Sequence, residues 1–373
     1  MKQICKNQFI SMKSSILLFV IILLCTIGLT ACSSTVPVAS NPTEPGHPYT
    51  KLCGYGRDRV NIMIYFYGSD LEDISHMASR DIQEIQGNSF SDNVRVFIQT
   101  DGGRNWDKSV IDASNEVVQR FMISKNGTEL IEANLCPVDY DVRESLEWFI
   151  SHTTNKYPAE RNILILWGHG NGSYFWQNDS SLPNGITPKE MDEILSKAGV
   201  KFEAIGFDAC GMSTLSMINV LSKHADYMIA ASTDEPIVGW NYGDWITTLS
   251  ENTSVEATTY LCQIVDDYIT AISEEEKTFD LAVFDLSKSR DFLNSIDQSF
   301  IAAYDKHNGN KSSSKGISMN EVLNIMTQEH SDSIIKAAEQ MTVTHKFNHS
   351  DASKTLGINV TASDINKMRE NKE

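Results

Sequence analysis

The feature that most limits the fold of this chain is a series of short apolar runs separated by stretches of helical spacing. Strands that are apolar throughout belong in a parallel sheet covered on both faces, whereas half-exposed strands alternate in polarity. The sequence therefore predicts an α/β fold with a mainly parallel central sheet. The runs are NIMIYFY (61–67), VRVFIQ (94–99), NILILW (162–167), FEAIGF (202–207), YMIAAS (227–232), DLAVFDL (280–286) and TLGINV (355–360).

Helices are expected between these runs, at about 70–85, 141–154, 212–224, 254–273 and onward from 287 to about 307. Asp70 follows the first run as the expected N-cap of the first helix. The segment EVVQRFMI (116–123) alternates and turns at Asn126-Gly127, which predicts a half-exposed or hairpin strand. The polar stretch HNGNKSSSKG (307–316) is expected to be a surface loop.

Residues 1–31 have the layout of an export signal. Lys2, Lys6 and Lys13 precede an apolar stretch that is too short for a comfortable membrane span, and no acidic residue precedes Cys32. The stretch ends in Leu-Thr-Ala-Cys32, which resembles the bacterial lipobox. That resemblance implies cleavage before Cys32 and attachment of lipid to its thiol and to the new amino terminus. An ordinary signal peptide and an uncleaved anchor are the alternatives.

A tether and one large domain are expected to follow the signal. Residues 32–55 are rich in Pro, Ser and Thr, as in an extended linker, and residues 56–373 hold all the strand and helix patterns. From Cys32 onward, loss of the three leader lysines leaves 28 basic and 49 acidic residues, a formal charge of −21. This charge repels phosphate backbones, so nucleic acid is not an expected partner, whereas cationic substrates are favoured.

The cysteines after Cys32 do not form a recognisable framework. Cys53, Cys136, Cys210 and Cys262 are irregularly spaced and include no CxxC pair, so neither a disulfide scaffold nor a zinc site is indicated. A Cys53–Cys136 bridge remains open from the sequence alone. His345 and His349 would share one face of a helix and bind metal there, but no third ligand stands nearby, and no metal is expected.

Reactive side chains follow two successive apolar runs. NILILW leads into His169 and Gly170, and FEAIGF leads into Asp208 and Cys210. In a parallel sheet, chemistry collects at the carboxyl ends of the strands, where these residues would face one another. A cysteine ahead of a helix gains thiolate character, and an imidazole can take its proton and later protonate a leaving amine. The N–H groups of Gly170 and Cys210 would form an oxyanion hole.

Taken singly, each reactive residue has a simpler interpretation. A cysteine at a strand end is usually a small buried hydrophobe, and a histidine after a strand is usually a capped loop residue. The pairing of two glycine-flanked reactive residues at successive strand ends favours a catalytic site. A zinc or serine hydrolase is not indicated, because the sequence contains neither HExxH nor GxSxG.

Two segments, YPAERNILILWGHGNGS and IGFDACGMSTL, resemble the histidine and cysteine motifs of clostripain-like cysteine peptidases, family C11 of the caspase-like clan. The resemblance is collinear from about residue 60 to 290. It implies a caspase-like α/β/α sandwich, a Cys–His dyad and cleavage after Arg or Lys. It makes His169 the general acid and base, Cys210 the nucleophile, and Asp208 the acid that receives a basic P1 side chain.

Three departures from the family pattern qualify this comparison. The second acid expected in the S1 pocket, beside Asp208 and Trp240, is replaced by Asn241. No Lys or Arg stands between Gly170 and Pro188, which argues against self-processing there. The chain ends soon after TLGINV, so the C-terminal part of the domain is expected to be reduced. The residues indicate no cofactor; a calcium requirement is admitted by the resemblance alone.

Together these features predict a lipid-anchored cysteine endopeptidase on the outside of a bacterial envelope, acting on proteins or peptides that contain basic residues. The alternative is a catalytically silent lipoprotein of the same fold that binds peptides or surface partners. The intact dyad favours the enzyme, whereas the altered S1 surroundings favour the binder.

Overall fold

The structure is a computed structural model that describes residues 52–138, 140–176, 185–308, 316–349 and 355–370. The expected signal peptide, the lipobox with Cys32 and most of the expected tether lie outside the described residues, as does most of the 307–316 loop. Residues 48–373 form one compact unit.

The described residues form one large sheet of nine strands, in the order β10-β8-β7-β6-β5-β1-β2-β3-β4. Strands β2, β1, β5, β6 and β7 run parallel, so the expected mainly parallel sheet is confirmed. A β3–β4 hairpin and the antiparallel strands β8 and β10 complete the two edges. The bounds are β1 Val60–Tyr67, β2 Val94–Asp101, β3 Gln119–Ser124, β4 Gly127–Glu132, β5 Arg161–Trp167, β6 Phe202–Asp208, β7 Ala225–Ala230, β8 Asp280–Asp285 and β10 Thr342–Phe347.

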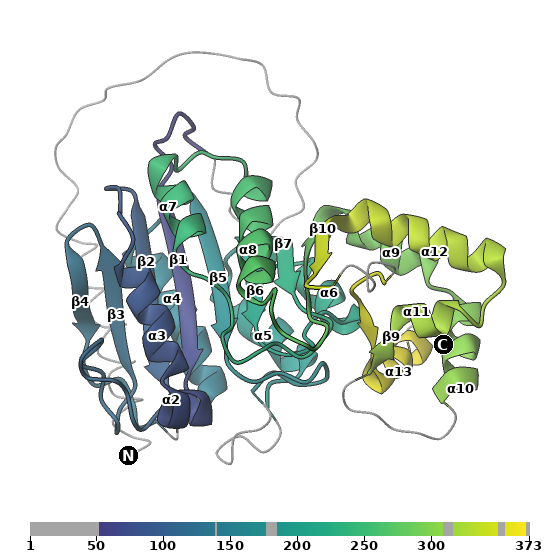
Figure 1. The fold of residues 1–373 in the computed structure, drawn as a ribbon, viewed down its shortest axis with the longest axis horizontal. Helices are drawn as coiled ribbons and strands as arrows, with labels where there is room; N and C mark the ends of the chain where they lie inside the picture. Colours follow the sequence, from purple (N-terminus) through teal and green to yellow (C-terminus); the bar gives the residue numbers. More distant parts are fainter. Residues whose placement is uncertain (1–51, 139, 177–184, 309–315, 350–354, 371–373) are drawn as a thin grey trace, which may run out of the picture. The chain divides into compact units, whose positions relative to one another are not determined.

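Helices cover both faces of this sheet (Figure 1). One apolar core lies between the sheet and α3, α7 and α8, and the other lies between the sheet and α4, α5 and α6. Alternate residues of β1 enter the two cores, which explains why the whole strand is apolar. The bounds are α3 Met77–Gln86, α4 Val142–Lys156, α5 Pro188–Ala198, α6 Leu215–Leu221, α7 Asp244–Glu251 and α8 Ala257–Ala271.

The C-terminal part adds further helices to the second core. Its two-stranded sheet pairs β9 (Ile317–Ser318) with β11 (Asn359–Val360). The apolar run TLGINV therefore contributes only two residues of strand, outside the main sheet. The helices are α9 Ser289–Ser295, α10 Gln298–Asn308, α11 Met319–Leu323, α12 Gln328–Met341 and α13 Ala362–Glu370.

The structure corrects one expected helix and bears on the cysteines and histidine considered above. The first expected helix is two helices, α2 (Ser69–Ser75) and α3, because His76 adopts a left-handed φ of 52° between them. The Cys53–Cys136 disulfide bond that the sequence left open is not formed. His345 lies on strand β10 rather than on a helix, and within the described residues no three His, Cys, Asp or Glu side chains are grouped as metal ligands. Among the helices of those residues, none has the length and hydropathy needed to span a membrane.

Candidate active site

The loops after β5 and β6 meet at the carboxyl edge of the sheet. Trp167 and Asp208 are register partners at the ends of the two strands, and the Gly168 N–H donates to the Asp208 carbonyl at 3.1 Å. A Cβ atom added to Gly170 would lie 2.6 Å from the Cys210 carbonyl oxygen. Only glycine permits this approach, so the two sequence motifs are in direct backbone contact.

The loop that carries His169 is fixed by a buried tryptophan. The Trp176 backbone N–H donates to the His169 carbonyl at 2.7 Å, and its indole N–H donates to the Trp167 carbonyl at 3.0 Å. Trp176 is fully buried against Tyr65 and Tyr67. Trp176 therefore ties down the backbone at His169 and at Trp167, two residues before it.

The imidazole of His169 has a carboxylate partner. Its Nε2 lies 2.6 Å from Oδ1 of Asp70, which is on α2 just after β1. The expectation that Asp70 caps the first helix was wrong: the N-cap position is Gly68, without a side-chain cap. Although partial burial opposes ionisation, the hydrogen bond and charge of His169 hold the pKa of Asp70 below its usual value.

The thiol of Cys210 is held by the loop after β7. The Glu235 N–H points at Sγ with an N–S distance of 3.2 Å, and the Glu235 carbonyl is 3.8 Å from Sγ. A thiol can donate to that carbonyl, and a thiolate can accept from that N–H. Two backbone bonds join the same loops, from Gly211 to the Thr233 carbonyl at 2.8 Å and from Ser213 to the Ala231 carbonyl at 2.9 Å.

The helix expected to activate the thiol does not begin at Cys210. Helix α6 starts at Leu215, and the hydroxyl of its N-cap, Thr214, accepts from the Met217 N–H at 3.3 Å. Cys210 is four residues before that cap, and helix dipole effects fade within one turn. The N–H of Glu235 takes the place of the helix as the local donor to sulfur.

Asp208 is buried behind the thiol. Its Oδ2 accepts from the Tyr242 hydroxyl at 2.8 Å and from the Trp240 N–H at 3.3 Å. Burial raises the pKa of Asp208 to about 6, although the bonds from Tyr242 and Trp240 work in the opposite direction. Burial and the neighbouring Asp208 also raise the pKa of Glu235, whose carboxyl oxygens are buried. Two acids thus share one desolvated space beside Cys210.

The two other residues expected in the S1 pocket are turned to structural contacts. The Trp240 ring is 1% exposed and packs so closely on Gly206 that an added Cβ there would lie 2.8 Å from the ring. The Asn241 side chain accepts from the Gly243 N–H at 2.8 Å. Two acids remain beside the thiol: Asp208 stands two residues before Cys210 in the chain, and the backbone of Glu235 contacts Sγ.

A buried aspartate anchors the loop that carries Glu235. Asp280 accepts from both N–H and hydroxyl of Ser232, at 2.9 and 2.6 Å, and of Thr233, at 2.9 and 2.8 Å. Its Oδ2 also lies 2.8 Å from Nε2 of His345. This carboxylate ties the loop after β7 to strands β8 and β10.

The C-terminal segment holds the same loops from another side. The Asn359 N–H donates to the Ser213 carbonyl at 2.8 Å, and its side-chain amide donates to the Ser232 carbonyl at 2.6 Å. The Ser213 hydroxyl donates to the Gly357 carbonyl. Residues just after Cys210 and just after β7 are thus joined through one later segment.

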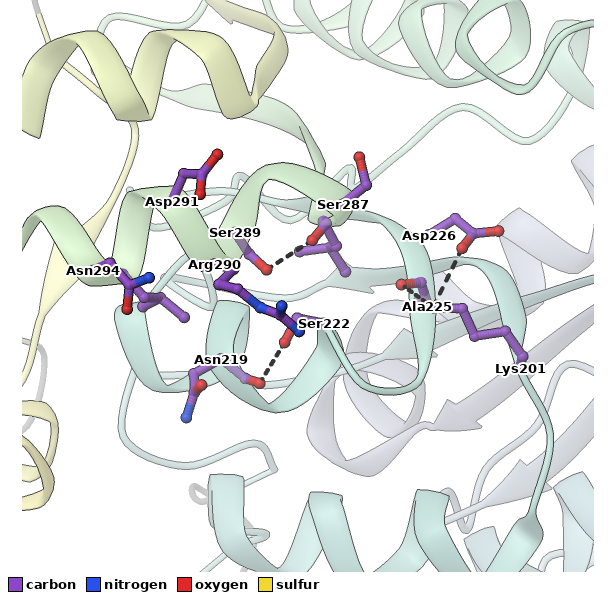
Figure 2. Close-up of a pocket in the computed structure, with 12 residues that line it drawn as sticks. Lys201, Asn219, Ser222, Ala225, Asp226, Ser287, Ser289, Arg290, Asp291 and Asn294 are labelled. Carbon is purple, nitrogen blue, oxygen red and sulfur yellow. Dashed lines mark hydrogen bonds and ion pairs between the residues drawn. The ribbon is translucent and has the colours of Figure 1, made fainter. Parts of the chain in front are cut away.

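A separate cavity of about 700 Å³ lies at the opposite edge of the sheet (Figure 2). It is lined by polar residues around the start of β7 and the end of β8, among them Lys201, Asp226 and Arg290. Lys201 donates to the Ala225 carbonyl at 2.8 Å and pairs with Asp226 at 3.2 Å. Because these residues lie at the amino ends of β6 and β7, the cavity is not part of the His169–Cys210 site.

Three residues of the site were missed in the sequence. Asp70 was interpreted as a cap, whereas Glu235 and Asp280 were not considered. A signal did exist for Glu235, because it follows β7, the next parallel strand beside β6, at the same edge of the sheet. Nothing local marks Asp280, since its partners lie 47, 48 and 65 residues away.

Comparison with known proteins agrees with this geometry. The clostripain family (peptidase C11) matches residues 64–368. No curated protein matches. The solved structures that resemble the chain include an inactive zymogen C11 protease from Parabacteroides distasonis, with 18% identity and a TM-score of 0.60 over 84% of this chain and 96% of that one.

Two further solved structures come from Bacteroides thetaiotaomicron. A secreted C11 cysteine protease called iotapain has 13% identity and a TM-score of 0.62 over 84% of this chain and 97% of that one. A secreted C11 cysteine protease in complex with an irreversible peptide inhibitor has 15% identity and a TM-score of 0.56, covering 82% and 92%. At these identities the structures support the caspase-like α/β/α fold, and the family match covers most of the sequence. The chain belongs to the clostripain family of cysteine peptidases.

Proposed function

We propose that this peptidase is an endopeptidase that cleaves after Arg or Lys with a Cys210–His169 dyad, and that a lipid on Cys32 displays it outside the cytoplasm. The observation that supports the dyad most strongly is the contact of the Gly170 and Cys210 backbones, which brings the two motifs to one edge of the sheet. The secreted relative supports a location outside the cytoplasm.

The proposed reaction proceeds through a thioester. Cys210 first transfers its thiol proton to His169, and the resulting thiolate Sγ then attacks the carbonyl carbon of the scissile bond. The N–H groups of Gly170 and Cys210 stabilise the oxyanion that forms on the carbonyl oxygen. His169 then protonates the leaving amine as the C–N bond breaks. Water, deprotonated by His169, attacks the thioester and releases the acid product and the thiol.

The Glu235 backbone supports the first step. A thiolate has lone pairs but no proton, so the N–H that lies 3.2 Å from Sγ can stabilise it by a charge-assisted hydrogen bond. This contact offsets the unfavourable proximity of Asp208, whose negative charge opposes thiolate formation.

The specificity for basic residues is supported by the two buried acids. A cationic P1 side chain that displaces the Tyr242 or Trp240 contact would meet Asp208, with Glu235 beside it. The Asp208 carboxylate is buried without a cation until a basic P1 side chain binds. Pairing with that side chain relieves the cost of the buried charge, so it favours binding of basic substrates.

The nucleophile is tested by alkylation and turnover. In a soluble form comprising residues 33–373, iodoacetamide at mildly acidic pH should label Cys210 before Cys136 or Cys262, because a thiolate attacks far faster than a thiol. Burial raises the pKa of the Cys262 thiol, so this residue serves as an internal control. Cys210→Ala should abolish cleavage of Arg and Lys fluorogenic peptides, and His169→Ala should reduce it by roughly 10²–10⁴-fold.

A second candidate is a silent peptide-binding lipoprotein of the same fold. The burial of Asp208 and the replacement of the second S1 acid by Asn241 favour it. Equal labelling of Cys136, Cys210 and Cys262, together with no turnover of either peptide type, would establish this candidate and exclude the dyad.

A further inference from the structure

The ion pair between Asp70 and His169 has no counterpart in a two-residue dyad. It joins side chains 99 residues apart, from the segment after β1 to the loop after β5. Strands β1 and β5 are direct neighbours, with Phe66 paired to Trp167, so their carboxyl ends present the two side chains to each other. The side chains are 63% and 24% exposed, so both remain accessible at the mouth of the site.

The backbone around Asp70 is built to hold this position. Ser69 adopts a left-handed φ of 44°, which is costly for a residue with a Cβ and is concentrated at functional sites. A Cβ added to Gly68 would lie 2.8 Å from Cβ of Glu72, so the turn closes tightly. The Ser69 hydroxyl also donates to the same Asp70 oxygen at 3.1 Å.

A buried glutamate fixes the helix independently of Asp70. Glu72 is fully buried and accepts the Ser79 N–H at 2.9 Å, which ties α2 to α3. Asp73 is the third acid on α2. It faces the loop after β2 and accepts the N–H groups of Arg104 at 2.6 Å and Asn105 at 2.9 Å. Of the three acids, Asp70 is the one whose side chain contacts His169, and it makes no capping hydrogen bond to the helix end.

We infer that Asp70 is a positioning residue for His169 and a third member of the proposed Cys210–His169 machinery, on which this inference rests. Its carboxylate accepts a hydrogen bond from Nε2–H, which fixes the tautomer and leaves Nδ1 as the nitrogen that exchanges a proton with Cys210 and the leaving amine. When Nδ1 gains the thiol proton, the same carboxylate stabilises the imidazolium charge. Asp70 itself remains ionised throughout.

The test compares Asp70→Asn with Asp73→Asn in the 33–373 protein. Both changes remove one negative charge from α2, but the second keeps an oxygen acceptor for its two N–H donors and does not contact His169. Asp70→Asn should lower kcat about tenfold through loss of a charge-assisted bond, with KM and the melting temperature nearly unchanged because the pair is solvent-exposed. Asp73→Asn should leave kcat unchanged.

The pH profile gives a signature that a structural role would not produce. The alkaline limb of kcat/KM reports loss of the imidazolium proton, which the Asp70 carboxylate opposes. Asp70→Asn removes this carboxylate and should therefore move the alkaline limb to lower pH, whereas Asp70→Glu should keep part of the wild-type profile. An unchanged profile in Asp70→Asn would overturn the inference.

Alkylation of Cys210 by iodoacetamide separates this inference from the dyad itself. Asp70→Asn should slow alkylation at mildly acidic pH in the wild-type background and have no effect in a His169→Ala background, because Asp70 acts through the imidazole. An equal slowing in both backgrounds would show that Asp70 acts without His169. Faster alkylation would mean that Asp70 restrains the histidine, which would also overturn the inference. If His169→Ala alone alkylates like wild type, the dyad fails instead.

Discussion

At the scale of single residues, the site combines a thiol with two carboxyl groups that are shielded from water. Asp208 and a charge on Cys210 both oppose ionisation of Glu235, whereas a hydrogen bond from Glu235 favours the ionised form of Asp208. A protein retains such a cluster when the charges have a use. In the proposed function that use is the recognition of a cationic side chain.

Asp208→Asn tests this use. The change should lower kcat/KM for Arg and Lys substrates by roughly 10- to 100-fold, because a charge-assisted contact becomes a neutral one. A substrate with an uncharged P1 should lose much less.

The wild type should show the same discrimination as a function of pH. As pH drops through about 6, where Asp208 takes up its proton, kcat/KM should fall more for basic substrates than for substrates with an uncharged P1.

The melting temperature gives the complementary result for the same variant. The folded pKa of Asp208 lies above that of an unfolded aspartate, so its stabilising contribution is present at low pH and is lost as pH rises through about 6. Asp208→Asn should therefore melt at the same or a higher temperature than wild type at pH 7. A uniform loss on all substrates with a lower melting temperature would assign Asp208 to structure alone.

Single residues were predictable where a motif marked them, and not where a distant partner defines their role. His169 and Cys210 stand in recognisable motifs, and the structure brings their loops into contact. Asp70 has the composition and place of an N-cap, and only its 2.6 Å contact with a residue 99 positions away shows otherwise. The same holds for Asp280, whose partners come from two distant segments, the loop after β7 and strand β10.

At the scale of elements, the apolar strands were predictable because both faces of each are buried. β1, β5 and β6 lie where the sequence placed them, within one residue at each end. Helix ends were not predictable to that accuracy. The break at His76 depends on α2 being tied by Glu72 to Ser79, and β10 was missed because its residues are only half-buried.

The loop after β7 depends on one such long-range tie. Asp280→Asn would place an amide donor opposite donors of Ser232 and Thr233 and should destabilise the fold by about 3 kcal/mol at pH 7, since its carboxylate is buried and fully used. Activity should fall too, because this loop presents the Glu235 N–H to Sγ. Asp285→Asn, at the half-buried end of the same strand, is the control: asparagine can keep the contact with the Ser287 N–H, so neither stability nor activity should change.

The difference in stability between wild type and Asp280→Asn should depend on pH. Burial opposes ionisation of Asp280, but hydrogen bonds from His345, Ser232 and Thr233 hold its pKa below the usual value. Its contribution is therefore present above the pKa of an unfolded aspartate, about 4, and is lost as pH falls through the lower folded value. Thermal melts of wild type and Asp280→Asn should converge below about pH 4. A constant gap down to pH 2 would contradict this assignment.

At the scale of the whole molecule, the peptidase unit is compact by itself. Residues 48–373 form that unit, so a protein that begins near Tyr49 should fold alone and show the thermal melt of the 33–373 form. Cys32→Ala should block lipidation and leave the precursor uncut at that site, as mass spectrometry of the isolated protein would show. An unmodified mature terminus near residue 32 in wild type would indicate an ordinary signal peptide instead.

The contact between the C-terminal segment and the nucleophile loop has a consequence for the time at which activity arises. A ribosome adds Gly357 144 residues after Ser213, its hydrogen-bond partner. For all of that interval, His169 and Cys210 are already in the nascent chain, but the bonds from Gly357 and Asn359 that brace their edge of the sheet are not yet made. We expect the peptidase to be inert during most of its synthesis, and a chain stopped after residue 353 to alkylate Cys210 slowly. Order of translation would then delay activity until the chain is nearly complete.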